Sequence, residues 1–194
     1  MSNSSSHKRI LRLVQISLFA ALVVVFQVIS TVVPMPFVRI TLTLIPVVLG
    51  GIYFGKFAGA FLGAVFGAVV TAFTVSGFDL GANMMFVANP ILTVFICFAK
   101  GMLAGFCAAL VYELLVNKIG KTRSIFLSAA IAPIVNTAFF CMFLYAFYPD
   151  ILNTWAGGTN VFIYMITGLV GINFVVEFLC NIIICISCVY SCKY

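Results

Sequence analysis

The sequence predicts an all-α integral membrane protein with six transmembrane helices. The 194 residues are 64% hydrophobic and 7% charged, whereas an ordinary globular domain carries about a quarter charged residues. Uncharged segments of roughly twenty residues, long enough to cross a ~30 Å hydrocarbon core, recur along the chain, and the charges fall mostly between them. We therefore expect a basic tail at residues 1–12 and a single six-helix transmembrane domain at residues 13–192.

The first half of the chain is expected to supply three helices, at residues 13–33, 44–55 and 57–76. Pro34 and Pro36 end the first helix, because proline lacks the amide hydrogen that a continuing helix needs. An outer loop that carries Arg39 follows. The second helix is short for a membrane span, so we expect it to be tilted, continued by part of the preceding loop, or buried among its neighbours.

The second half is expected to supply three longer helices, at residues 90–117, 124–148 and 161–189. A loop at 77–88 precedes the first of them, and a loop at 149–160 precedes the last. Asn89 and Pro90 mark the start of the first of these helices. An asparagine side chain caps free amide groups, and proline is tolerated in the first turn.

Small residues recur at helical spacing in the third helix. Gly59, Gly63 and Gly67 lie four apart, and three alanines accompany them at Ala60, Ala64 and Ala68. Such small side chains let a neighbouring backbone approach closely, which is how helices associate within lipid. This helix is expected to form a tight contact with a neighbour.

The distribution of charge predicts the orientation. Most basic residues fall on the side of the two termini, at Lys8, Arg9, Arg12, Lys56, Lys118, Lys121, Arg123 and Lys193. By the positive-inside rule both termini are then cytoplasmic, in a multi-pass protein of the cell membrane. The net charge of +6 does not indicate nucleic-acid binding, because these residues lie at helix ends and form no basic face.

Polar residues at membrane depth are the candidate binding residues, because a charge there is costly and is retained by pairing or by function. Lys100 lies about 15 Å into its helix, counted from Pro90. Three predicted helices carry polar side chains that could converge on one cavity. The helix from residue 90 has Asn89, Thr93 and Lys100 on one face, the helix from residue 124 has Asn136, and the helix from residue 161 has Asn173, Glu177 and Asn181.

Each of these residues also has a purely structural interpretation. Lys100 and Glu177 could form a buried pair that holds two helices in register. Asn136 could hydrogen-bond a carbonyl freed by Pro133. Arg39 could anchor the chain at the membrane interface.

The sequence predicts no enzyme and no cofactor. Residues 119–123, IGKTR, resemble the end of a phosphate-binding loop, but Leu115 stands where that motif requires a glycine. His7 is the single histidine, and none of the seven cysteines has metal-ligand spacing with it. No combination of serine, histidine and acid indicates a hydrolase, so neither ATP-driven chemistry nor a metal centre is expected.

The chain resembles the substrate-binding S component of an energy-coupling factor (ECF) vitamin transporter. The resemblance rests on GxxFGKxxGAxLG at 51–63, KGxLAG at 100–105 and APIVNT at 132–137, and it favours the pantothenate branch. It implies a subunit that captures a vitamin from outside and delivers it with a scaffold membrane protein and two ATPase subunits.

The resemblance also implies roles for particular residues. Lys100, Asn136 and Asn173 match positions that the family uses for ligands, and the loop that carries Arg39 would gate the site. In the family, two alanines separated by three residues meet the scaffold; Ser17 and Ala21 occupy those positions here.

The charge count is consistent with a substrate that has one carboxylate. Arg39, Lys100 and Glu177 together would give the cavity a charge of about +1, with Lys100 holding the carboxylate as a charged donor. Thr93, Asn136 and Asn173 would meet amide and hydroxyl groups, as pantothenate has. Two alternatives remain: riboflavin or another vitamin, and an assembly subunit without any small ligand.

Overall fold

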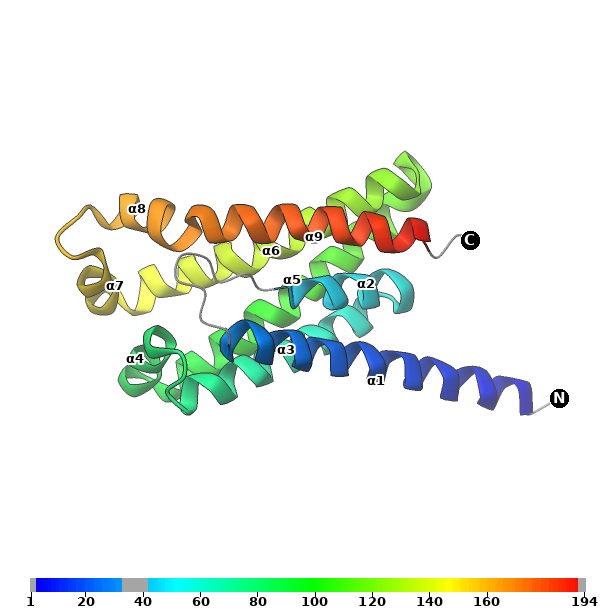
Figure 1. Cartoon of the computed structure of the whole chain (residues 1–194), viewed down its shortest axis with the longest axis horizontal. Helices are drawn as coiled ribbons and strands as arrows, with labels where there is room; N and C mark the ends of the chain where they lie inside the picture. Colours follow the sequence, from blue (N-terminus) through cyan, green and yellow to red (C-terminus); the bar gives the residue numbers. More distant parts are fainter. Residues whose placement is uncertain (1–2, 33–41, 192–194) are drawn as a thin grey trace.

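The computed structural model describes residues 3–32 and 42–191, and every element within those ranges is helical (Figure 1). In chain order the elements are α1 (Asn3–Val32), α2 (Leu44–Phe54), α3 (Lys56–Val75), α4 (Leu80–Ala88), α5 (Pro90–Ile119), α6 (Lys121–Phe147), α7 (Pro149–Ala156), α8 (Val161–Tyr164), the π-helical segment η1 (Met165–Val170) and α9 (Gly171–Ser191). Arg39, and with it the predicted outer loop, lies outside the described residues.

Five stretches of helix are long and apolar enough to cross a membrane. They are α1, α3, α5, α6 and the run from α8 through α9. The sixth apolar helix, α2, has 11 residues and a length of only about 16 Å. Its residues Leu44–Gly51 are all buried, so α2 is enclosed by its neighbours, as its short length predicted.

The structure corrects two predicted loops, since both contain helices. Asp79 begins α4 by accepting a hydrogen bond from the Ala82 amide (3.2 Å), and the Asn83 side chain donates to the Thr74 carbonyl of α3 (2.9 Å). Pro149 occupies the first turn of α7. Two further differences concern boundaries: α1 begins at Asn3, within the predicted tail, and the last predicted helix changes to π geometry over η1.

The predicted close contact of the third helix is confirmed, and its partner is α5. A Cβ added to Gly59 would lie 2.5 Å from the Gly105 carbonyl oxygen, and one added to Gly67 would lie 2.6 Å from the Cys97 carbonyl oxygen. Both distances are too short for a real contact. The α3 and α5 backbones therefore touch directly over about two helical turns, from Gly59 to Gly67.

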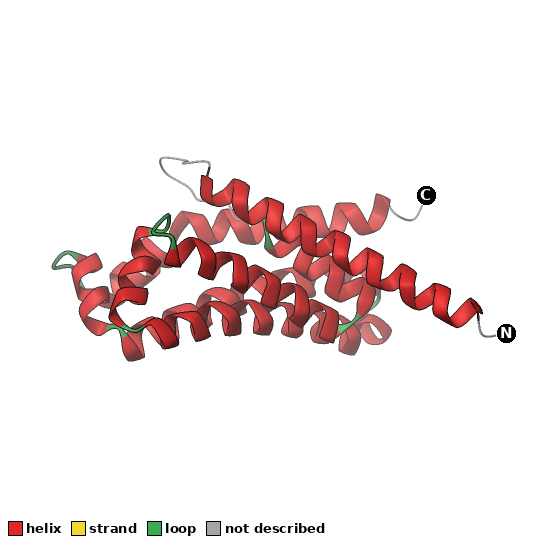
Figure 2. Ribbon diagram, turned by 90° about the horizontal axis from the view of Figure 1, so that it is seen from below, coloured by secondary structure: helices red, strands yellow, loops and turns green. Residues whose placement is uncertain are grey.

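The bundle is elongated, and its two ends differ (Figures 1 and 2). Both described ends of the chain, together with the turns between α2 and α3 and between α5 and α6, lie at one end. The short helices α4, α7 and α8 gather at the other end. This second end, away from the termini, holds a cavity of about 480 Å³.

Candidate functional site: a cavity beneath α4 and α7

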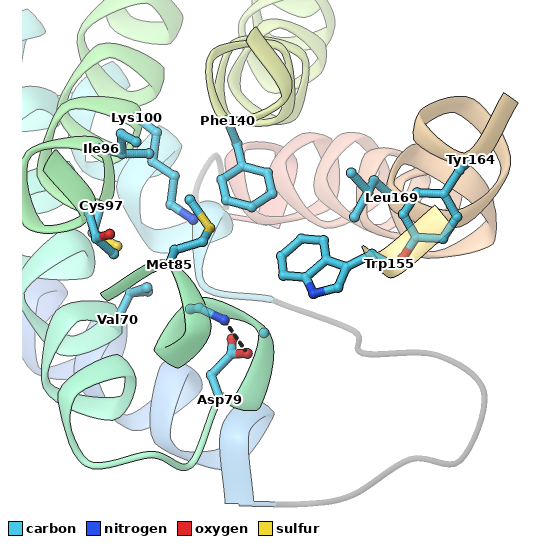
Figure 3. A pocket seen from close by; sticks show the side chains of 13 residues that line it. Val70, Asp79, Met85, Ile96, Cys97, Lys100, Phe140, Trp155, Tyr164 and Leu169 are labelled. Atoms are coloured by element: carbon cyan, nitrogen blue, oxygen red, sulfur yellow. Dashed lines mark hydrogen bonds between the residues drawn. The ribbon is translucent and has the colours of Figure 1, made fainter. Parts of the chain in front are cut away.

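A cavity of about 480 Å³ opens at the end of the bundle that carries the short helices (Figure 3). Its volume lies within the range of small-molecule sites. Residues from seven elements line it: Val70 of α3, Asp79, Gly81, Ala82 and Met85 at α4, Thr93, Ile96, Cys97 and Lys100 of α5, Phe140 of α6, Trp155 of α7, Tyr164 of α8 and Leu169 of η1.

Lys100 supplies the positive charge of the cavity. Its side chain extends toward Met85, and the Phe140 ring lies to one side of it (Figure 3). The ammonium nitrogen lies 5.0 Å from the centroid of the Phe140 ring and 5.9 Å from that of Phe66, within the range of cation–π attraction. Among the described residues no carboxylate lies within ion-pair distance of this ammonium. The ammonium can therefore donate hydrogen bonds to an anionic group in the cavity.

Thr93 joins the cavity wall to the junction of α6 and α7. Its side chain is 1% exposed, and its hydroxyl oxygen lies 2.7 Å from that of Tyr148. Both hydroxyls also lie within hydrogen-bond distance of the Asn89 carbonyl, at 2.9 and 3.2 Å. This network fixes the start of α5 against the start of α7 at the wall of the cavity, which Thr93 lines.

Asp79 and Trp155 define the outer part of the cavity. The Asp79 carboxylate accepts from the Ala82 amide at the start of α4 (Figure 3). A Cβ on Gly81 would lie 3.3 Å from the Trp155 ring, so the glycine lets the indole pack closely on α4. Helices α4 and α7 thus meet over the cavity. The charge count from sequence omitted Asp79, which adds a negative charge to the positive charge of Lys100.

Asn136 is not among the described residues that line the cavity, but it lies on α6 one helical turn from Phe140, which does, and so shares its face. Its side-chain oxygen is buried and has no hydrogen-bond partner among the described residues. A buried acceptor without a partner costs about 1–3 kcal/mol. Because the unpartnered atom is an acceptor, it could accept a hydrogen bond from a ligand or a water molecule.

The structure brings together only some of the residues predicted from sequence. Thr93 and Lys100 line the cavity, whereas the exposed Asn89 side chain caps α5 by accepting from the Leu92 amide (3.1 Å). Glu177 is partly buried on α9 and is not among the described lining residues. The side chain of Asn173, like Arg39, lies outside the described part of the chain.

Sequence reasoning missed the contributions of Asp79, Met85 and Phe140. The first two were assigned to a loop, although the Asp79 cap three residues before Ala82 is a recognisable helix-start signal. Trp155 and Tyr164 add aromatic rings that the search for polar residues did not single out. Both line the cavity.

Comparison with known proteins identifies the family. Residues 11–192 match the family model of the ECF transporter, substrate-specific component. No curated protein and no solved structure shows a significant match. Members of this family are membrane transport subunits rather than enzymes, and they bind a small molecule and work with a membrane-embedded scaffold and an ATPase module. Because the match covers nearly the whole chain, this protein belongs to the family of ECF transporter substrate-specific components.

Proposed function

We propose that this chain is the high-affinity pantothenate-binding subunit of an ECF transporter in the bacterial plasma membrane. It would capture the vitamin from outside and deliver it with a scaffold protein and two ATPase subunits. The observation that carries the proposal is the Lys100 ammonium, which lies in a small-molecule-sized cavity without a carboxylate partner among the described residues.

The chemistry of the cavity supports a substrate with an anionic end and a hydroxyl-bearing end. Lys100 would hold the carboxylate through charge-assisted hydrogen bonds. Asp79, in the outer part of the cavity, would accept from a hydroxyl group, and the Asn136 oxygen would accept from an amide or hydroxyl. Pantothenate carries all three kinds of group. Arg39, Asn89, Asn173 and Glu177 stay predicted contributors to this site.

The arrangement of charges supports cytoplasmic termini. Lys56, Lys118, Lys121 and Arg123 lie at the end of the bundle that also carries the termini, whereas the cavity lies at the other end. Under the positive-inside rule, the cavity then opens outward. In this orientation α2, although short, would be the sixth transmembrane helix, alongside the five longer spans of a single domain.

The exposed face of α1 supports the proposed contact with the scaffold. Ser17 and Ala21 lie one turn apart, and both are exposed. Next to them Leu18 is 62% exposed. Small side chains within an apolar face allow another helix to pack closely in lipid, so this face would meet the scaffold protein.

The test is the thermal stability of the detergent-purified protein with each member of a vitamin panel. A ligand at 1,000 times its dissociation constant stabilises the folded state by about 4 kcal/mol. We expect a large increase in melting temperature with pantothenate, which Lys100→Met abolishes. The control is Lys118→Met, an exposed lysine of the same helix, which should leave the increase unchanged. A full increase in the Lys100→Met protein would contradict the assigned role of Lys100.

Riboflavin is the second candidate, and one observation favours it. Phe140, Trp155 and Tyr164 line the cavity, and aromatic rings stack well on a flat heterocycle. A melting-temperature increase with riboflavin alone would keep the binding role and reject the carboxylate argument. If no vitamin stabilises the protein but a scaffold protein does, the chain is an assembly subunit instead.

A further inference from the structure

A second hollow lies at the end of the bundle that carries the termini. It has a volume of about 420 Å³ and is lined by Ile119 of α5, Thr122, Arg123, Phe126 and Leu127 of α6, and Ile186 of α9. Within this lining, Arg123 is the charged residue, and since the surface that faces the hollow is almost wholly apolar, Arg123 lines it with its methylene stem. Phe126 and Leu127 are 44% and 39% exposed. The hollow is therefore an apolar groove on the outside of the bundle, and the vitamin site described above does not use it.

The order of residues along α6 matches the order of groups in a phospholipid. Arg123 is in the first turn of the helix, at the end of its span, and Phe126 and Leu127 follow about one turn deeper, or roughly 5 Å further into the membrane. A cation at this level meets lipid headgroups, and the apolar residues below it meet acyl chains.

The surrounding charge favours an anionic headgroup. Lys118 and Lys121 flank the turn between α5 and α6, close in sequence to Arg123. The chain has four acidic residues. Of these, Glu113 on α5 is 3.5 Å from Lys56, and Asp79 and Asp150 belong to the opposite end of the bundle. Glu177 is on α9, but it lies nine residues before Ile186, about 13 Å along the helix toward that opposite end. The groove thus has a net positive environment that complements a phosphodiester.

A hydrogen bond joins two of the helices that border the groove. The hydroxyl groups of Thr122 and Tyr190 are hydrogen-bonded to each other, which ties the start of α6 to the end of α9. Arg123 itself is exposed, and its planar guanidinium is suited to bidentate contact with phosphate oxygens.

We propose that this groove is a specific site for an anionic phospholipid of the leaflet nearest the termini, with the headgroup phosphate on Arg123 and an acyl chain along Phe126, Leu127 and Ile186. The site is independent of the vitamin-binding function, because it shares no residue with the cavity at the other end.

The test is native mass spectrometry of the full-length protein with added dioleoyl phosphatidylglycerol or dioleoyl phosphatidylcholine. We expect phosphatidylglycerol to remain bound in preference to phosphatidylcholine. Arg123→Gln should weaken phosphatidylglycerol binding by about tenfold or more, as loss of one charge-assisted hydrogen bond predicts. Arg123→Lys, which keeps the charge but loses the bidentate geometry, should give an intermediate affinity. Melting temperatures of the variants check that each one is folded.

The matched control is Lys118→Gln, which removes a nearby exposed charge that does not line the groove. It should change the affinity by less than about threefold, because the attraction of an exposed charge is largely screened. Equal binding of the two lipids, or an unchanged affinity in Arg123→Gln, would overturn the proposal and leave only non-specific lipid contact.

Two further experiments distinguish a lipid from the other possible occupants of the groove, a soluble anion and a protein partner. Glycerol 3-phosphate carries the phosphate without acyl chains, and we expect it not to compete; effective competition would mean a soluble-anion site and would overturn the lipid assignment. Phosphatidylglycerol should also remain bound in the complex with scaffold and ATPase subunits. Its exclusion from that complex would show that protein covers the groove, and would likewise overturn the proposal.

Discussion

Gly63 of α3 and Gly101 of α5 face each other so closely that a Cβ added to either residue would overlap the carbonyl oxygen of the other. Lys100 is the residue next to Gly101 in the chain. The glycine contact therefore sets the position of α3 relative to the helix that supplies the cavity with its positive charge.

Gly63→Ala should destabilise the protein, because one of the two backbones would have to move. Overpacking typically costs about 1–3 kcal/mol, and a clash with backbone belongs at the upper end of that range. The measurement is thermal unfolding in detergent. Ala68→Leu, at an exposed position of the same helix, is the control and should have little effect. An unchanged melting temperature for Gly63→Ala would mean that the two helices can separate at no cost.

Ligand binding should change the intrinsic fluorescence of the protein. Trp155 is the single tryptophan of the chain and lines the cavity, so its emission reports on that site alone. We expect a saturable change in emission on titration with the bound vitamin, and no change in Trp155→Phe. In Lys100→Met the titration should shift to much higher ligand concentration. A vitamin that stabilises the protein without changing this emission would have to bind elsewhere.

The hydrogen bond between Thr93 and Tyr148 should show energetic coupling. Thr93→Val and Tyr148→Phe each remove one hydroxyl while keeping the side-chain shape. Each should cost about 1 kcal/mol of unfolding free energy. The double variant should cost less than the sum, by roughly 0.5 kcal/mol or more, because the two groups are in direct contact. Strict additivity in this cycle would show that the two hydroxyls do not interact.

Glu113 of α5 should stabilise the start of α3. One of its carboxylate oxygens accepts from the Lys56 amide at 3.0 Å, and the other lies 3.5 Å from the Lys56 ammonium. Glu113→Ala removes both contacts and should cost about 1 kcal/mol, as loss of a helix cap does. Glu113→Gln keeps an acceptor for the amide and loses only an exposed ion pair, so it should cost less, about 0.5 kcal/mol. Unfolding measurements that rank the two variants in the opposite order would assign the effect to charge rather than capping.

The sequence by itself was sufficient to predict that the chain lies in a membrane, where the long helices run approximately, and that the glycines of α3 form a close helix contact. Each of these depends on local information: hydropathy over about twenty residues, helix-breaking prolines, and small residues four apart. The start of α5 at Asn89 and Pro90 was equally local, and it is confirmed. Lys100 stood out for the same reason, since a charge within an apolar helix is visible without any knowledge of neighbours.

Only the tertiary structure decided which polar residues share a cavity. Asn89, Thr93 and Lys100 lie on one stripe of α5, yet the Asn89 side chain caps the helix while the other two line the cavity. Asp79 and Trp155 join them because α4 and α7 fold over the end of the bundle, and Gly81 lets the indole approach α4. Such contacts join segments tens of residues apart, and they depend on how each helix is rotated and where each short helix packs, which no local pattern specifies.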